Sequence, residues 1–125
     1  MILGADFVFT IGKRYKGQAS DTCKTYRIIP LYHYTNFEDF YRHMPYNCQL
    51  VGAEIDNRAT DIKNFVHPER CICLLGAEDH GLTKKVINKC HHIVQLPGEI
   101  SLNVAVAGSI IMYDIISKTM QKNTV

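Results

Sequence analysis

The stretch that decides the fold lies between residues 74 and 117 and contains two short loops. It reads LLGAEDHGL over residues 74–82 and LPGEISLNVAVAGSIIMYD over residues 96–114. Each loop follows an apolar run, residues 70–75 and residues 92–96, that is typical of a buried strand. Ligands of open α/β sheets bind outside the carboxyl ends of the strands, so both loops are candidate ligand sites.

Strands and helices are expected to alternate along the rest of the chain. The patterns predict strands at residues 7–12, 27–29, 49–54, 70–75 and 92–96. A capping box at residues 35–38 predicts a helix that ends near residue 43, and further helices are expected within 57–65, at 83–89 and at 102–118, with a frayed tail from residue 121. This order predicts one α/β domain over residues 1–125 with a mainly parallel sheet.

Bulk properties indicate an ordinary globular protein. With 125 residues the chain suits one domain, and 46% hydrophobic against 21% charged residues is the balance of a soluble fold. No apolar run reaches the roughly 18–20 residues that cross a bilayer. The first residues lack a basic segment ahead of an apolar one, so we expect no secretory signal, no membrane contact and a cytoplasmic protein.

A basic stretch follows the first expected strand. The net charge of +2 alone gives no strong case for nucleic acid. The basic residues are interleaved with Tyr15 and Tyr26, and they are Lys13, Arg14, Lys16, Lys24 and Arg27. Such a mixture can contact phosphates and stack on RNA bases. The alternative is a solvated loop, which the sequence by itself favours.

The five cysteines indicate reduced thiols, because an odd count without a secretory signal argues against a disulfide framework. Cys71 and Cys73, followed later by Cys90 and two histidines, invite a zinc interpretation. Zinc sites, however, space paired cysteines more widely and on a turn, whereas this pair lies in an expected buried strand. There cysteine behaves as a small hydrophobic residue, so we expect no structural metal.

Polar residues in the two loops are the candidates for chemistry. In the first loop Gly76 and Gly81 allow close backbone approach to a ligand, and Glu78 supplies a carboxylate. In the second loop Ser101 and Asn103 stand where the last helix should begin. Taken separately, both loops have ordinary explanations, as glycine-rich loop composition and as helix N-caps.

Taken together, the two loops closely resemble the last two motifs of the SpoU/TrmH family of SPOUT RNA methyltransferases. The resemblance consists of the Gly-Glu-Gly loop and, further along, a proline followed by Ser-Leu-Asn and a helix of small residues. More loosely, residues 3–8 resemble the end of that family's first helix and the start of its second strand. The resemblance thus extends over nearly the whole chain and is strongest in the last third.

The resemblance implies a deep trefoil knot at the C-terminus, formed by the final helix, with S-adenosylmethionine bound in the knot. Three loops would hold the cofactor, at residues 53–54, 75–76 and 96–102. The residues that the resemblance assigns to this role are Ala53, Glu54, Leu75, Gly76, Gly81, Leu96, Pro97, Ile100, Ser101 and Leu102. It further implies a homodimer built partly by the last helix, and transfer RNA or ribosomal RNA, not DNA, as substrate.

The resemblance also implies catalytic roles for Glu78, Ser101 and Asn103, which match polar residues of the family's active centre. Asn103 would position groups beside the cofactor, and Ser101 would contact the cofactor or the ribose. The cofactor's sulfonium is electrophilic, so the protein has to bring a ribose hydroxyl close and remove its proton.

One departure from the family pattern concerns its first motif, which carries an Asn and an Arg. Met1 falls after that position, and no basic residue precedes Lys13. Three hypotheses therefore stand: an RNA 2′-O-ribose methyltransferase, a catalytically silent homologue that binds cofactor or RNA, and a knot domain that pairs with another chain. We expect weak or silent activity on RNA.

Overall fold

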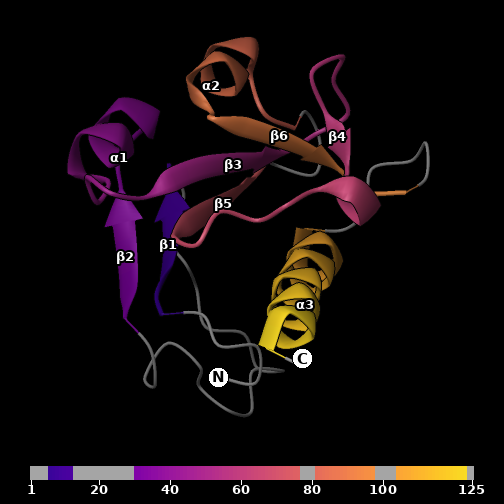
Figure 1. Ribbon diagram of the computed structural model, residues 1–125. Coiled ribbons are helices and arrows are strands. Elements are labelled where there is room, and N and C mark those ends of the chain that lie inside the picture. The colour runs from indigo at the N-terminus through magenta and orange to yellow at the C-terminus, as the bar shows by residue number, and fades with distance from the viewer. Residues whose placement is uncertain (1–5, 13–29, 77–80, 98–103, 124–125) are drawn as a thin grey trace. The chain divides into compact units, whose positions relative to one another are not determined.

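The computed structural model describes residues 6–12, 30–76, 81–97 and 104–123 (Figure 1). Residues 121–123 are described by their backbone alone. The chain divides into two compact units, Met1–Pro45 and Tyr46–Val125. Each unit is described by itself.

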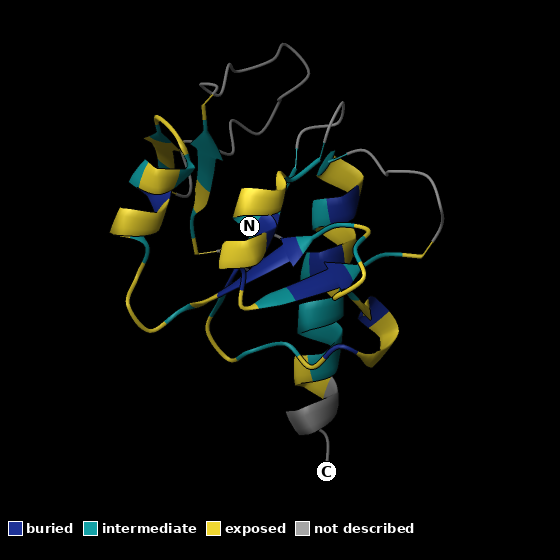
Figure 2. Ribbon diagram, turned by 90° about the horizontal axis from the view of Figure 1, so that it is seen from above, coloured by how far each residue is buried: buried dark blue, intermediate teal, exposed yellow. Residues whose placement is uncertain are grey.

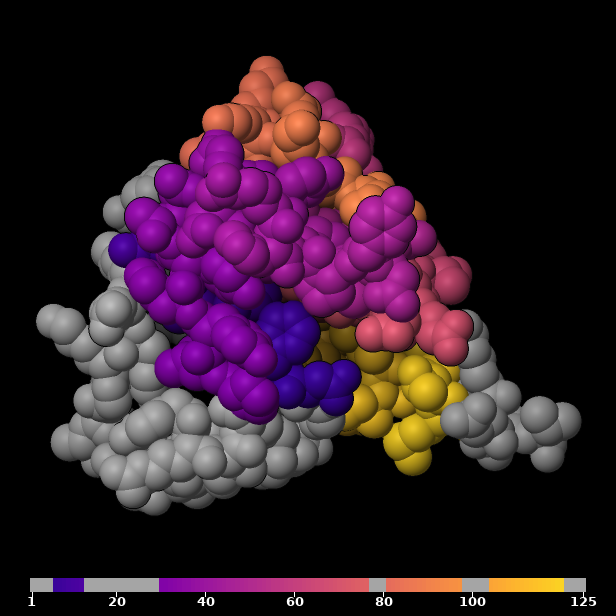
Figure 3. All heavy atoms as spheres, turned by 90° about the vertical axis from the view of Figure 1, so that its left-hand side faces the viewer, coloured from indigo at the N-terminus to yellow at the C-terminus, as the bar shows by residue number. Residues whose placement is uncertain are grey.

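The first unit contains a two-stranded parallel sheet and one helix. Strands β1 (Val8–Ile11) and β2 (Leu31–Tyr34) pair in register from Val8 opposite Leu31, and helix α1 spans Phe37–His43. Phe40 of α1 is only 1% exposed, because its ring stacks on Phe9 at 4.5 Å and meets the edge of Tyr34 at 5.5 Å. The core of this unit is therefore aromatic. The outer surface of β2 and α1 is visible in Figure 3.

In this unit one predicted strand is not tested, and one predicted helix cap needs correction. The expected strand at residues 27–29 lies outside the described residues, and the strand that is described begins after Pro30. A proline is tolerated there because its carbonyl still accepts a hydrogen bond, from the amide of Val8 at 3.0 Å. The cap of α1 is Asn36, one residue later than expected. Asn36 accepts from the amide of Asp39 at 2.8 Å, and Asp39 accepts from the amide of Thr35 at 3.0 Å.

The second unit holds a four-stranded sheet in the order β4-β6-β3-β5, and every pair in it is parallel. Its elements are β3 (Gln49–Ala53), β4 (Thr60–Asp61), the 3-10 helix η2 (Ile62–Asn64), β5 (Cys71–Leu75), α2 (Lys84–Lys89), β6 (His92–Gln95) and α3 (Val104–Asn123). The expected α/β class with a mainly parallel sheet is confirmed.

Helices cover both faces of this sheet (Figure 1). On one face Val51, Val94 and Ile111 of α3 form a buried cluster with Ile62 and Phe65. Figure 2 shows this buried centre of the sheet in dark blue. On the other face a methyl group at Gly52 would lie 2.9 Å from the sulfur of Cys90, the residue that ends α2. The absence of a side chain at Gly52 therefore lets the end of α2 pack closely on β3.

Three boundaries in this unit differ from expectation. Strand β4 was not predicted, since two polar residues carry no alternating pattern. The short helix expected within residues 57–65 is the 3-10 helix η2. Helix α3 continues to Asn123, past the expected end at residue 118 and into the expected frayed tail, while its expected start at residues 102–103 lies outside the described residues. Within the described parts of the chain, no helix has the length and apolar character of a membrane span.

Candidate cofactor-binding site

The carboxyl ends of three neighbouring strands meet at one edge of the second unit's sheet. Strand β3 lies between β5 and β6, and Ala53 is the register partner of both Leu75 and Val94. The amide of Glu54 donates to the carbonyl of Val94 at 3.1 Å, which extends this pairing one residue beyond β3. The three chain segments predicted from residues 53, 75 and 96 onwards therefore begin side by side.

Apolar side chains from these three strand ends lie on the same side of the sheet. Ala53, Leu75 and Leu96 are half-buried, and all pack against the cluster that contains Ile111. Helix α3 comes close at this point, because a methyl group at Gly108 would lie 3.1 Å from the Cδ1 atom of Leu75. Three of the predicted cofactor contacts thus form one apolar surface beside α3.

Gly76 marks a close approach between two backbone segments. A methyl group built on Gly76 would lie 2.5 Å from the amide nitrogen of Leu82 and closer still to the carbonyl carbon of Gly81. Real side chains do not tolerate such distances, so even alanine at position 76 requires the backbone to move. The glycine expected to allow close approach is thus needed for contact with the chain's own backbone.

Gly81 has a left-handed backbone conformation, with φ at +62°. A methyl group there would collide with the Oε2 atom of Glu54. The same oxygen accepts a hydrogen bond from the amide of Leu82 at 2.8 Å, while Oε1 accepts from the amide of Ile55 at 3.0 Å. The carboxylate of Glu54 therefore contacts the protein backbone on both of its oxygens.

Several predicted site residues lie outside the described part of the chain. These are the catalytic candidates Glu78, Ser101 and Asn103, the cofactor candidates Ile100 and Leu102, and the RNA candidates Lys13, Arg14, Lys16, Lys24 and Arg27. Pro97 is described and exposed, directly after Leu96.

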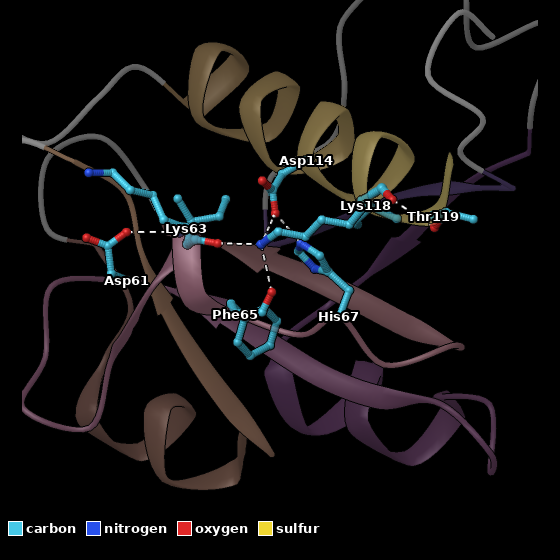
Figure 4. A network of polar contacts seen from close by, with 9 residues as sticks. Asp61, Lys63, Phe65, His67, Asp114, Lys118 and Thr119 are labelled. Carbon is cyan, nitrogen blue, oxygen red and sulfur yellow. Dashed lines mark hydrogen bonds and ion pairs between the residues drawn. The ribbon is translucent and has the colours of Figure 1, made fainter. Parts of the chain in front are cut away.

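A polar cluster under α3 was missed by the sequence analysis, and we call it the α3 clamp: His67, Asp114 and Lys118 (Figure 4). The ammonium of Lys118 donates to the carbonyls of Ile62 and Phe65, at 2.6 and 2.7 Å, and to Asp114 at 2.8 Å. An ammonium has three protons, so these contacts use all of them. The sequence signal that could have indicated this cluster is the pair of opposite charges at Asp114 and Lys118, four residues apart in an apolar helix.

His67 completes the clamp from the segment before β5. Its side chain is 6% exposed, and Nε2 lies 2.6 Å from Oδ2 of Asp114. Because a carboxylate only accepts, Nε2 carries the proton of this contact, while Nδ1 is buried without a partner among the described residues. Burial raises the pKa of Asp114, but hydrogen bonds and charge from Lys118 and His67 outweigh it and leave that pKa below its usual 3.8.

The cysteines of β5 form a pair of interacting thiols. Cys71 and Cys73 are free, half-buried and pack against the core cluster beside α3. A hydrogen bond from Cys73 lowers the pKa of Cys71 to about 7, against the opposing effect of burial, and the same bond together with burial raises the pKa of Cys73. Among the described residues, no three His, Cys, Asp or Glu side chains converge as metal ligands would.

Comparison with known proteins places these features in a family. The SpoU rRNA methylase family model matches residues 2–113. A relative from Staphylococcus haemolyticus, classed with TrmH family tRNA/rRNA methyltransferases, is 35% identical over 75 residues, which are 58% of this chain and 30% of that protein. The chain thus spans about a third of the length of the curated relatives it matches.

Solved structures show the same fold. The SpoU methyltransferase AviRb from Streptomyces viridochromogenes, in complex with the cofactor AdoMet, matches with a TM-score of 0.79 at 20% identity, over 96% of this chain and 52% of that one. A structure concerned with 2-OH methylation of C/U34 on tRNA matches with a TM-score of 0.72 at 18% identity, over 90% and 78%. The family match over residues 2–113 spans both units and agrees with the fold, so the chain belongs to the SpoU rRNA methylase family.

Proposed function

We propose that this chain is an S-adenosylmethionine-dependent RNA methyltransferase domain that modifies a ribose 2′-hydroxyl of transfer or ribosomal RNA. The main support is that the ends of β3, β5 and β6 meet at one edge of the sheet, next to Gly76 and Gly81. AviRb, a member of the same family, is described with AdoMet bound. The family match across both units supports a single domain. A cytoplasmic location is part of the same proposal.

The residues at this edge fit a nucleoside cofactor. Ala53, Leu75 and Leu96 offer an apolar surface for a purine ring, and such pockets add a small number of polar groups, often from the backbone, to fix its orientation. The cofactor supplies a methyl group on an electrophilic sulfonium. The protein's share of the chemistry is to hold the ribose hydroxyl in line and accept its proton, for which Glu78, Ser101 and Asn103 remain the proposed residues.

The same proposal includes the C-terminal trefoil knot. In it the final helix, expected over residues 102–118, passes through the loop after residue 76. The short approach of Gly108 on α3 to Leu75 at the end of β5 supports a tight fit between the helix and this edge. RNA would be held by the basic stretch from Lys13 to Arg27, through its phosphates.

We also propose that a second copy of this chain covers one side of α3. The exposed apolar side chains of the helix are Val106, Ile110, Tyr113 and Met120. Their spacing of four, three and seven residues puts them in one stripe, the pattern by which helices pair. Tyr113 is 66% exposed and contributes the largest ring of this stripe. Light scattering should therefore give a dimer, and Tyr113→Glu should shift it toward monomer.

The test of function is methyl transfer from labelled S-adenosylmethionine to bulk transfer and ribosomal RNA. A 2′-O-methyl group blocks the neighbouring phosphodiester from alkaline cleavage, so any label transferred to RNA, even at a weak rate, should appear in alkali-resistant dinucleotides. Label in alkali-sensitive mononucleotides would instead mean base methylation and would contradict the ribose assignment. Absence of both transfer and cofactor binding in calorimetry would contradict the proposal as a whole.

A further inference from the structure

We propose that Glu54 is a positioning residue of the cofactor site, whose carboxylate holds the backbone of Gly81 and Leu82 in place beside Gly76. The inference rests on the proposed function, which makes this edge the cofactor site. The family resemblance suggested that Glu54 contacts the cofactor directly. The present proposal instead gives Glu54 the task of holding the backbone.

The evidence is the geometry around the carboxylate. Oε2 accepts from the amide of Leu82, 28 residues further along the chain, at 2.8 Å, and Oε1 accepts from the neighbouring amide of Ile55 at 3.0 Å. The side chain therefore ties the end of β3 to the segment that leads into α2. Gly81 lies directly against the same Oε2 atom, in a conformation that side chains disfavour.

A carboxylate is the right group for this task because it accepts on both oxygens. Glutamine has the same shape but only one acceptor oxygen, and its NH2 group would face one of the two amide donors. Hydrogen bonds from amides to an ionised acceptor are also stronger than those between neutral groups. In the described part of the chain no ion pair joins Glu54 to a cation, and its carboxylate accepts from two backbone amides.

The consequence for the site follows from Gly76. The backbone of Gly81 and Leu82 is held so close to Gly76 that a single methyl group would not fit between them. The proposed cofactor pocket is lined by backbone at this point. The position of the Leu82 backbone therefore determines the shape of the proposed pocket. Releasing Leu82 from Glu54 should therefore weaken cofactor binding while leaving the aliphatic core intact.

The experiment combines two measurements on the whole chain. Calorimetry measures the affinity for S-adenosylhomocysteine, and hydrogen exchange measures the protection of the Leu82 amide without ligand. For Glu54→Gln we expect affinity and protection each to fall about tenfold, as for loss of a hydrogen bond to a charged acceptor. Glu69→Gln, the same change at an exposed glutamate, should alter neither.

Partial retention by Glu54→Asp separates positioning from general stability. Aspartate keeps two acceptor oxygens on a shorter stem, so its affinity should lie between those of wild type and Glu54→Gln. It also serves as the test variant should Glu54→Gln fail to fold. Wild-type affinity and wild-type Leu82 protection in the folded Glu54→Gln variant would overturn the inference. If the wild type binds no S-adenosylhomocysteine, the proposed function fails, and Leu82 protection still decides the role of Glu54.

Discussion

Glu54 and Lys118 hold the protein backbone in opposite ways at two places in the second unit. Glu54 uses a negative charge to accept two amides, at the edge where β3, β5 and β6 end. Lys118 uses a positive charge to donate to two carbonyls, in the α3 clamp. The ammonium of Lys118 also forms an ion pair with Asp114, which balances its charge. Among the described residues, no cation forms an ion pair with Glu54.

This difference separates a structural contact from a site-forming one. The clamp is closed, because all three protons of Lys118 are used and the side chain of His67 is only 6% exposed. At the strand-end edge, glycines at positions 76 and 81 allow backbone segments and the Glu54 carboxylate to pack closely, and this edge is where we propose that the cofactor binds. Changes at the edge should therefore act on ligand binding, and changes in the clamp on folding stability.

The largest expected effect is on cofactor affinity when Gly76 gains a side chain. Both Gly76→Phe and the much smaller Gly76→Ala should weaken binding of S-adenosylhomocysteine by about 100-fold or more, since the added carbon would displace the backbone of Leu82. Calorimetry provides the measurement. Gly12→Ala is a useful control, because its methyl group meets no atom within 4 Å and costs only backbone strain. If Gly76→Ala binds S-adenosylhomocysteine with unchanged affinity, the cofactor does not bind at this edge and the proposed site is wrong.

A smaller effect is expected in the thiol chemistry of β5, the strand that runs between the two regions. At pH 7 half of Cys71 is thiolate, since its pKa is about 7, whereas burial raises the pKa of Cys90 to about 11. Allowing for the weaker nucleophilicity of a low-pKa thiolate, Cys71 should alkylate about 50-fold faster than Cys90. Iodoacetamide labelling with peptide mass spectrometry measures both rates. Equal rates would show that the hydrogen bond from Cys73 does not form.

The clamp itself should give a loss of stability. Lys118→Met keeps the apolar stem but removes three hydrogen bonds, so we expect unfolding to become easier by about 2 kcal/mol, roughly 30-fold in the folding equilibrium. Urea denaturation measures this. Lys63→Met, at an exposed lysine of η2, should change stability little. Cofactor affinity should stay near wild type in both variants, and a large loss of affinity in Lys118→Met would erase the distinction between the two regions.

The sequence was informative where a pattern has a local cause. The ends of β3, β5 and β6 could be placed because apolar runs stop there, and Gly76 and Gly81 because only glycine suits such positions. The cap of α1 was misplaced by one residue because Thr35 and Asn36 are both good caps, and the contact with Asp39 decides between them.

Contacts between residues far apart in the chain could not be predicted from the sequence. Nothing in the chain around Glu54 indicates that its carboxylate binds the amide of Leu82, because that contact depends on how the end of β3 and the segment before α2 lie in space. The same holds for Lys118 and the carbonyls of Ile62 and Phe65, more than fifty residues earlier. Sequence patterns thus predicted where β3, β5 and β6 end, while the contacts of the charged side chains required the structure.

The smallest expected effect concerns the pH dependence of the clamp. Asp114 has a lowered pKa in the folded protein, against 3.8 as the ordinary value in the unfolded chain. Its stabilising contribution is therefore complete above pH 3.8 and is lost as the pH falls from there through the folded-state pKa.

Asp114→Asn removes that titration and keeps the shape. At pH 7 the variant should be less stable than wild type by about 1 kcal/mol, roughly fivefold, because a partly exposed ion pair contributes little more. Urea denaturation at steps from pH 7 to pH 3 should show this difference shrinking below pH 4 as the wild-type carboxyl is protonated. A constant difference over the whole range would mean that Asp114 acts through packing, and that the clamp needs no charge to hold α3.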